Sequence, residues 1–256
     1  MNIVTCFKFT PDSEDIEVMK DGSISVDKAE WVISDYDLNA VEAATKLVEA
    51  GSGKVTALSA GIPKISNSKL KKDILSRGPN ELYLVVDEKM GINDTHFTAQ
   101  VLAAAIKKLG QVDLVICGEG SSDLYFQQVG LQLGEILGWP TVNSVGKIEA
   151  SGSNVVVDRS LEDEIEVLEV PLPAVLAVTT DINAPRLPSM KEIIKAGQKP
   201  VVEWKLADLA VEGANGVDIV SVNAPRQADR KRIMIEAKPE DAVAALVGYL
   251  SKDGAL

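Results

Sequence analysis

The regular alternation of strand-like and helix-like segments before Pro140 constrains the fold more than any other feature of this sequence. Four apolar runs are typical of buried strands: 1–9, 55–61, 81–87 and 113–118. Helical periodicity separates them, over 34–51, 66–78, 95–110 and a last segment that ends near Gly138. Strands that alternate with helices indicate a parallel sheet, and continuously apolar strands indicate a sheet covered on both faces. We therefore expect an α/β fold, a Rossmann-like open parallel sheet with helices on both faces.

The pattern changes after Pro140. Alternating apolar and polar residues over 154–170, with a charged turn at 161–164, predict an antiparallel hairpin. Another apolar strand is expected within 172–181, and a proline-containing loop leads to a short basic helix at 191–197. An antiparallel hairpin is therefore expected in addition to the α/β sheet.

The last part of the chain has weaker signals. Three short β-rich patches, 201–205, 217–222 and 230–236, precede a terminal helix over 240–254. This part cannot obviously close a compact core of its own. We therefore divide the chain into an α/β domain, 1–200, and an extended C-terminal arm, 201–256, that wraps a partner subunit; a separate small domain is the alternative.

Composition limits the classes of function. The formal net charge is −12, which disfavours nucleic acid as a partner because duplex binding needs a positive surface. A single histidine, His96, argues against a zinc cluster or a Ser-His-Asp triad. No metal site is expected. Both cysteines, Cys6 and Cys117, lie within apolar runs, which favours buried thiols over a disulfide or redox pair.

The sequence also indicates where the protein works. The chain starts directly with a strand-like run, without a charged and apolar leader, and no apolar run reaches about 18 residues. We expect a soluble, cytoplasmic protein.

The most suggestive local feature is the glycine-rich turn after the fourth strand. Ligands in open parallel sheets bind at the carboxyl ends of strands. The segment Gly118-Glu119-Gly120-Ser121-Ser122-Asp123 lies between that strand and a helix, so its backbone N–H groups could face an anion. It lacks the third glycine of the dinucleotide fingerprint and the Lys-Ser/Thr of a P-loop. A phosphate-binding turn and an ordinary tight turn both stay open. Asp35 or Asp37 is expected to cap the helix at 34–51.

The segment 157–177 resembles the pattern of electron-transfer-flavoprotein beta subunits. An aliphatic and a basic residue, Val157 and Arg159, precede an acidic cluster at 162–164. Every specified position that follows is also satisfied: Glu166, Leu168, Pro173, Val175, Leu176 and Ala177. Further similarity, especially over 33–44, 76–85, 117–137 and 179–200, covers most of the chain and points to the Fix-type subgroup, linked to bacterial carnitine or nitrogen-fixation metabolism.

The resemblance implies a heterodimer with an alpha subunit that carries most of a FAD site. The beta subunit would hold AMP, or a second FAD in bifurcating members, on an adenine-nucleotide-hydrolase-like sheet. Carried over by motif, the nucleotide contacts fall on Cys6, Ser34, Asp35, Tyr36, Asp37, Ala60, Gly118, Gly120, Ser121, Ser122, Asp123, Gln127, Gln128 and Val129. These residues are three strand ends and a helix start.

The chain departs from the family at several of these positions. Val129 replaces a threonine hydroxyl, which leaves the anion to Gln127, Gln128 and backbone N–H groups. Leu124 and Tyr125 stand where acidic residues are common. The choice between AMP and FAD therefore stays open. Tyr36 matches a family aromatic near the alpha-subunit flavin, with local packing as the equal alternative.

The resemblance also implies electron-transfer partners. The loop 184–191 matches the recognition loop that docks an acyl-CoA-type or other dehydrogenase, with Met190 in place of the anchoring leucine. Closure of its own subunit is the alternative role of this loop. Electrons would pass on to a quinone-linked oxidoreductase, and the chain would be a carrier subunit rather than an enzyme.

Two rival functions use similar sheets. An adenylating enzyme needs an SGGxDS-like loop after the first strand, where this chain has Lys8 to Asp15 with no glycine. A stand-alone, stress-protein-like nucleotide-binding protein usually ends soon after its sheet, whereas this chain continues with a hairpin, loop and arm. Both rivals fit the sequence less well.

Overall fold

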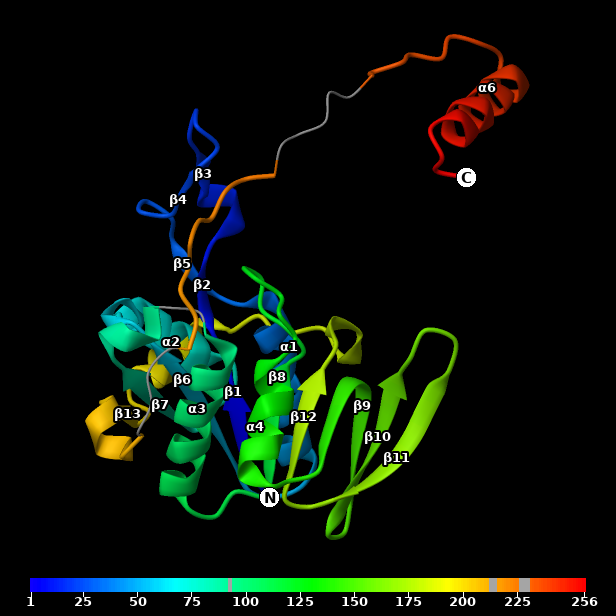
Figure 1. Cartoon of the computed structure of the whole chain (residues 1–256). Coiled ribbons are helices and arrows are strands. Elements are labelled where there is room, and N and C mark those ends of the chain that lie inside the picture. The colour runs from blue at the N-terminus through cyan, green and yellow to red at the C-terminus, as the bar shows by residue number, and fades with distance from the viewer. Residues whose placement is uncertain (92–93, 212–215, 226–230) are drawn as a thin grey trace.

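The computed structural model describes residues 1–91, 94–211, 216–225 and 231–256. Within them, nine strands form one sheet in the order β11-β10-β9-β12-β8-β1-β6-β7-β13 (Figure 1). The strands are β1 (Asn2–Cys6), β6 (Lys54–Gly61), β7 (Glu81–Val86), β8 (Leu114–Gly118), β9 (Thr141–Ser151), β10 (Asn154–Ser160), β11 (Ile165–Pro171), β12 (Ala174–Val178) and β13 (Val201–Trp204).

In this sheet order, every neighbouring pair between β9 and the edge strand β13 is parallel. The pairs β9–β10 and β10–β11 are antiparallel. The predicted α/β fold and its antiparallel hairpin are confirmed. The chain runs from β1 outward to β6 and β7, then returns to β8 on the other side of β1. The strand order therefore reverses between β1 and β8, which is where open α/β sheets bind ligands.

Helices cover both faces of the sheet. They are α1 (Asp35–Ala50), α2 (Ser68–Ser76), α3 (Thr95–Leu109), α4 (Val129–Leu137) and α5 (Met190–Ala196), whereas a sixth helix, α6 (Pro239–Lys252), does not contact the sheet. Adjacent residues of β1 point to opposite faces: Ile3 packs with α1, and Val4 packs with α3 and α4. A third cluster joins α1, α2 and α5 over β6 and β7. None of these helices combines the length and apolar character needed to cross a membrane.

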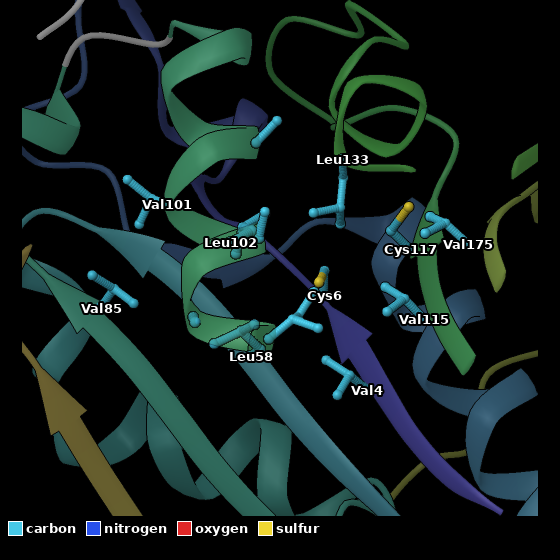
Figure 2. Close-up of a cluster of buried hydrophobic side chains, with 14 of the residues drawn as sticks. Val4, Cys6, Leu58, Val85, Val101, Leu102, Val115, Cys117, Leu133 and Val175 are labelled. Carbon is cyan, nitrogen blue, oxygen red and sulfur yellow. The ribbon is translucent and has the colours of Figure 1, made fainter. Parts of the chain in front are cut away.

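Figure 2 shows the core between the sheet and the helices α3 and α4. Side chains from the strands meet Val101 and Leu102 of α3 and Leu133 of α4. Cys6 and Cys117 are both buried in this cluster as free thiols, as predicted. Burial raises the pKa of the Cys117 thiol to about 12 and also raises that of Cys6. Both thiols therefore act as small apolar side chains.

The segment between β1 and α1 folds into two small antiparallel ribbons. In the first ribbon β2 (Phe9–Pro11) pairs with β5 (Trp31–Ile33), and in the second β3 (Glu17–Val18) pairs with β4 (Ile24–Ser25). The predicted first strand is interrupted after Cys6, because Phe9 leaves the main sheet to pair with Ile33.

The C-terminal part divides in two. β13 is the edge strand of the main sheet, beside β7. The strands predicted at 217–222 and 230–236 are absent from the described residues, where Asn223 makes one isolated bridge to Ser23. These segments find no neighbouring strand to satisfy their backbone groups. Parts of the predicted arm, 212–215 and 226–230, lie outside the described residues. In Figure 1, α6 lies apart from the body, and none of its residues is buried.

Candidate functional site

The candidate site lies at the carboxyl ends of β1 and β8, where the strand order reverses. Cys6 and Cys117 are register partners on these two strands. The chain continues past Cys6 to Lys8 and past Cys117 to the glycine-rich turn, so these two segments leave the sheet side by side. The first turn of α1 is hydrogen-bonded to both segments and forms the third part of the site.

Asp37 joins all three segments. Its carboxylate accepts hydrogen bonds from the backbone N–H of Lys8 (2.8 Å) and of Gly118 (3.0 Å). A Cβ at Gly118 would lie 2.8 Å from Asp37 Oδ1, so only glycine allows this close approach. The expected cap role of Asp35 or Asp37 is wrong: the N-cap of α1 is Ser34, and Asp37 binds backbone groups of other segments instead.

The Asp37 carboxyl is buried, with a relative exposure of 5%. Desolvation raises its pKa to about 7, while the hydrogen bonds from Lys8 and Gly118 and the charge of Lys8 favour the ionised form. Asp37 therefore changes its charge close to neutral pH, at the point where the three segments meet.

Two serines join the start of α1 to the turn. The backbone N–H of Asp35 donates to Ser122 Oγ (2.9 Å), and the backbone N–H of Ser122 donates to Ser34 Oγ (3.2 Å). The Ser34 hydroxyl, which caps no N–H of its own helix, thus holds the turn.

Lys8 places a cation beside the turn. Its Nζ donates to Asp123 Oδ2 at 2.6 Å, and Ser121 Oγ donates to the other carboxylate oxygen at 2.6 Å. Burial disfavours the ionised carboxylate of Asp123, but Lys8 and Ser121 outweigh it and hold its pKa below the usual range. Lys8 was absent from the predicted residues, although its place directly after the first strand is a signal that could have found it.

The end of the turn is built around two residues with left-handed backbone, Tyr125 (φ 48°) and Gln127 (φ 57°). Tyr125 Oη donates to Glu119 Oε1 (2.8 Å), and Gln127 Nε2 donates to Tyr125 Oη (3.2 Å). The Tyr125 ring lies 4.9 Å from that of Tyr36. Desolvation and the neighbouring Glu119 raise the pKa of Tyr125 to about 12, so the phenol stays protonated at neutral pH.

α4 begins at Val129, directly after the turn. Gln128 at its N-cap position makes no side-chain cap, and its Oε1 instead accepts a hydrogen bond from Thr95 Oγ1 (2.8 Å). The first N–H groups of α4 and the positive end of its dipole can therefore interact with an anion.

Ala60 is placed less centrally than the other predicted residues. It lies at the carboxyl end of β6, one strand beyond β1, and packs against the core cluster of α3 and α4. The hydrogen bonds that join β1, α1 and the turn run between other residues.

The loop 184–191 lies on a different part of α1. Arg186 donates to Glu42 Oε2 (2.6 Å) and to Glu49 Oε1 (2.7 Å), and its hydrogen bonds to Glu49 and Glu42, with their charges, raise its pKa. Asn39 Nδ2 donates to the backbone oxygen of Asn183 (2.7 Å), and Asn183 Nδ2 donates to that of Asn39 (3.0 Å). Sequence reasoning missed this clamp, because no local pattern marks its members.

The tip of this loop is exposed. Leu187 and Met190 have relative exposures of 89% and 74%. Ser189 and Glu192 form a capping box, so α5 begins at Met190, one residue before the predicted start. The clamp thus fixes the base of a loop whose apolar side chains face outward.

The comparison with known families agrees with this geometry. A family model described as the electron transfer flavoprotein domain matches residues 22–209, well over half of the chain. The match spans α1, the glycine-rich turn, the hairpin and the clamped loop. The chain therefore belongs to the electron transfer flavoprotein domain family.

Proposed function

We propose that the chain is the beta subunit of a heterodimeric electron transfer flavoprotein of the Fix type. One observation carries the proposal: the segments of Cys6, of 34–37 and of 118–129, expected from the resemblance to bind nucleotide, meet at the reversal point of the sheet. The proposed ligand is AMP or a second FAD. The subunit acts in the cytoplasm as an electron carrier, without an acid, base or nucleophile of its own.

The site has the donors that a nucleotide phosphate requires. The first N–H groups of α4, which no N-cap side chain binds, the hydroxyls of Ser121 and Ser122, and Lys8 all lie around the turn. A phosphate would compete with Asp123 for Lys8. Flavin supplies the redox chemistry when it is bound. The residues of this chain hold and orient the nucleotide.

The C-terminal arm is the proposed contact with an alpha subunit. One face of α6 is apolar, with Val243, Leu246, Val247 and Leu250 at i, i+3, i+4 and i+7 spacing. Leu246 and Val247 are about half exposed in the described chain. Such an apolar stripe is stabilising only when another surface covers it. We propose that the FAD-binding alpha subunit provides this surface.

The exposed tip of the loop 184–191 is the proposed contact with a dehydrogenase. Leu187 and Met190 supply flexible apolar side chains, while Arg186 holds the loop base on α1. Electrons received there would leave through a quinone-linked oxidoreductase.

The decisive experiment is co-expression with the alpha subunit of the source organism. We expect a one-to-one complex that contains FAD and, after denaturation, AMP or a second FAD detectable by mass spectrometry. Absence of both a copurifying partner and any nucleotide would overturn the proposal. ATP hydrolysis by the isolated chain would favour an adenylating enzyme instead.

The role of α6 can be tested in the same system. The double variant Leu246→Asp, Val247→Asp places two charges on the apolar face, and we expect loss of the complex with little change in the thermal unfolding of the beta chain. Ala245→Asp, on the opposite face of the helix, is the matched control and should leave the complex intact. Equal behaviour of the two proteins would rule out α6 as the contact.

A further inference from the structure

The segment 119–128 is held in an unfavourable backbone conformation. Tyr125 and Gln127 are both in the left-handed region, which residues other than glycine rarely adopt. Such conformations persist where the surrounding contacts enforce them, and they gather at ligand-binding sites. The contacts made by Tyr125 therefore indicate which side chain this backbone conformation positions.

The contacts fix the Tyr125 ring in one place. The backbone N–H of Tyr125 donates to the oxygen of Ser121 (3.1 Å), and its hydroxyl joins Glu119 and Gln127. The ring lies against Gly120, where an added Cβ would be 2.3 Å from ring atom Cδ2. The left-handed backbone of Tyr125 thus goes together with one fixed position of its ring.

The ring also contacts α1. The Tyr125 and Tyr36 rings are 4.9 Å apart between centroids and inclined by 35°. Tyr36 belongs to the first turn of α1, which Ser34 and Asp37 tie to the glycine-rich turn. Tyr125 remains 42% exposed. The two rings therefore form an aromatic surface, open to solvent, directly beside the phosphate donors of the turn.

We propose that Tyr125 is a specificity-determining residue of this site, whose ring, supported by Tyr36 and Gly120, stacks on the planar ring of the bound nucleotide. The inference rests on the proposed nucleotide-binding function. Adenine and isoalloxazine share the chemistry that the ring would recognise, because both offer a flat aromatic face. A phosphate at the turn and a stacked ring beside it would be recognised together.

The test uses the co-expressed heterodimer, stripped of nucleotide at the beta site and titrated separately with AMP and with FAD. Tyr125→Leu removes the ring, and we expect at least a tenfold weaker affinity for the stacked nucleotide. Tyr125→Phe keeps the ring and should remain within about threefold of the parent protein. Tyr249→Leu, the same change at an equally exposed tyrosine outside the site, is the matched control and should leave nucleotide affinity unchanged.

Gly120→Ala provides an independent variant, because its new methyl group would displace the ring without altering Tyr125. We expect it to weaken the same nucleotide as Tyr125→Leu. For a stacked flavin, both variants should also relieve quenching of the fluorescence of the flavin that stays bound to the intact dimer, measured after unbound FAD has been removed.

The outcomes separate the two proposals. If the parent heterodimer binds neither AMP nor FAD at the beta site, the proposed function fails. If it binds one of them but folded Tyr125→Leu and Gly120→Ala keep the parent affinity, only the role of Tyr125 is overturned. A weaker affinity for AMP alone identifies adenine as the stacked ring, and a weaker affinity for FAD together with stronger flavin fluorescence identifies isoalloxazine.

Discussion

Val175 in β12 and Val220 in the C-terminal arm are the same residue in opposite surroundings. Val175 is fully buried between the sheet and its helices, whereas Val220 is 96% exposed. The same contrast separates Leu176 of β12 from Leu246 of α6. The inner parallel strands have helices over both faces, whereas none of the described residues of the arm from 216 onward is buried. Apolar side chains in this part of the arm would therefore stabilise the protein only if another surface covered them.

The largest expected difference in the free energy of unfolding is between the same leucine-to-alanine substitution made in the body and in the arm. Leu176→Ala removes buried methyl groups and should lower the free energy of unfolding by about 2–5 kcal/mol. Leu246→Ala in the isolated chain should change it by less than about 0.5 kcal/mol, as for an exposed site. Urea-induced unfolding followed by circular dichroism measures both. Similar losses would mean that α6 packs on the body.

The next prediction concerns pH and the buried junction of the body. Asp37 has its pKa raised from 3.8 to about 7, so the folded state binds the proton more tightly than the unfolded chain does. Its contribution to stability is therefore greatest below about pH 4 and falls as pH rises to about 7, by at most about 4 kcal/mol.

Asp37→Asn removes this titration. We expect the stability of the variant, relative to the parent, to increase as pH is raised from 5 to 8. The variant should also lose a pH-independent amount of stability, because the amide oxygen of asparagine can replace only one of the two carboxylate oxygens that accept hydrogen bonds. Thermal unfolding at each pH provides the measurement. A difference that stays constant across this range would contradict the raised pKa.

A smaller effect should separate ion pairs of the two regions. Arg186→Gln leaves the buried Glu42 without its guanidinium partner and should cost about 1–3 kcal/mol. It should also speed hydrogen–deuterium exchange over 183–189. The control is Lys231→Gln, which breaks an exposed pair with Asp253 in the arm and should cost no more than about 1 kcal/mol. Equal losses in the free energy of unfolding would show that the ion pairs of Arg186 stabilise the protein no more than an exposed ion pair does.

Much of the body could be predicted because its signals are local. The apolar strands and helical periods gave the parallel sheet, and alternation over 154–170 gave the hairpin. The patches at 217–222 and 230–236 have strand-like composition as well, but a strand needs a paired neighbour, and composition does not supply one.

The candidate site was predicted only in part. Its position followed from a glycine-rich turn at a strand end, together with the family resemblance. The role of Asp37 was misjudged, because an acidic residue in a first helical turn looks like a cap unless its true partners, Lys8 and Gly118, are known. Lys8 and its partner Asp123 are 115 residues apart, and no periodicity links them.

The sequence by itself determined most strands of the main sheet, the helices and the turn that follows β8, because each depends on the burial pattern and backbone preferences of a short segment. Only the tertiary structure decided which polar groups meet. It joined Asp37 to two strand ends, Arg186 to the buried Glu42, and Tyr125 to Tyr36. Those contacts depend on the strand order of the folded sheet and on the packing of α1 against it, which bring together residues that are far apart in the chain.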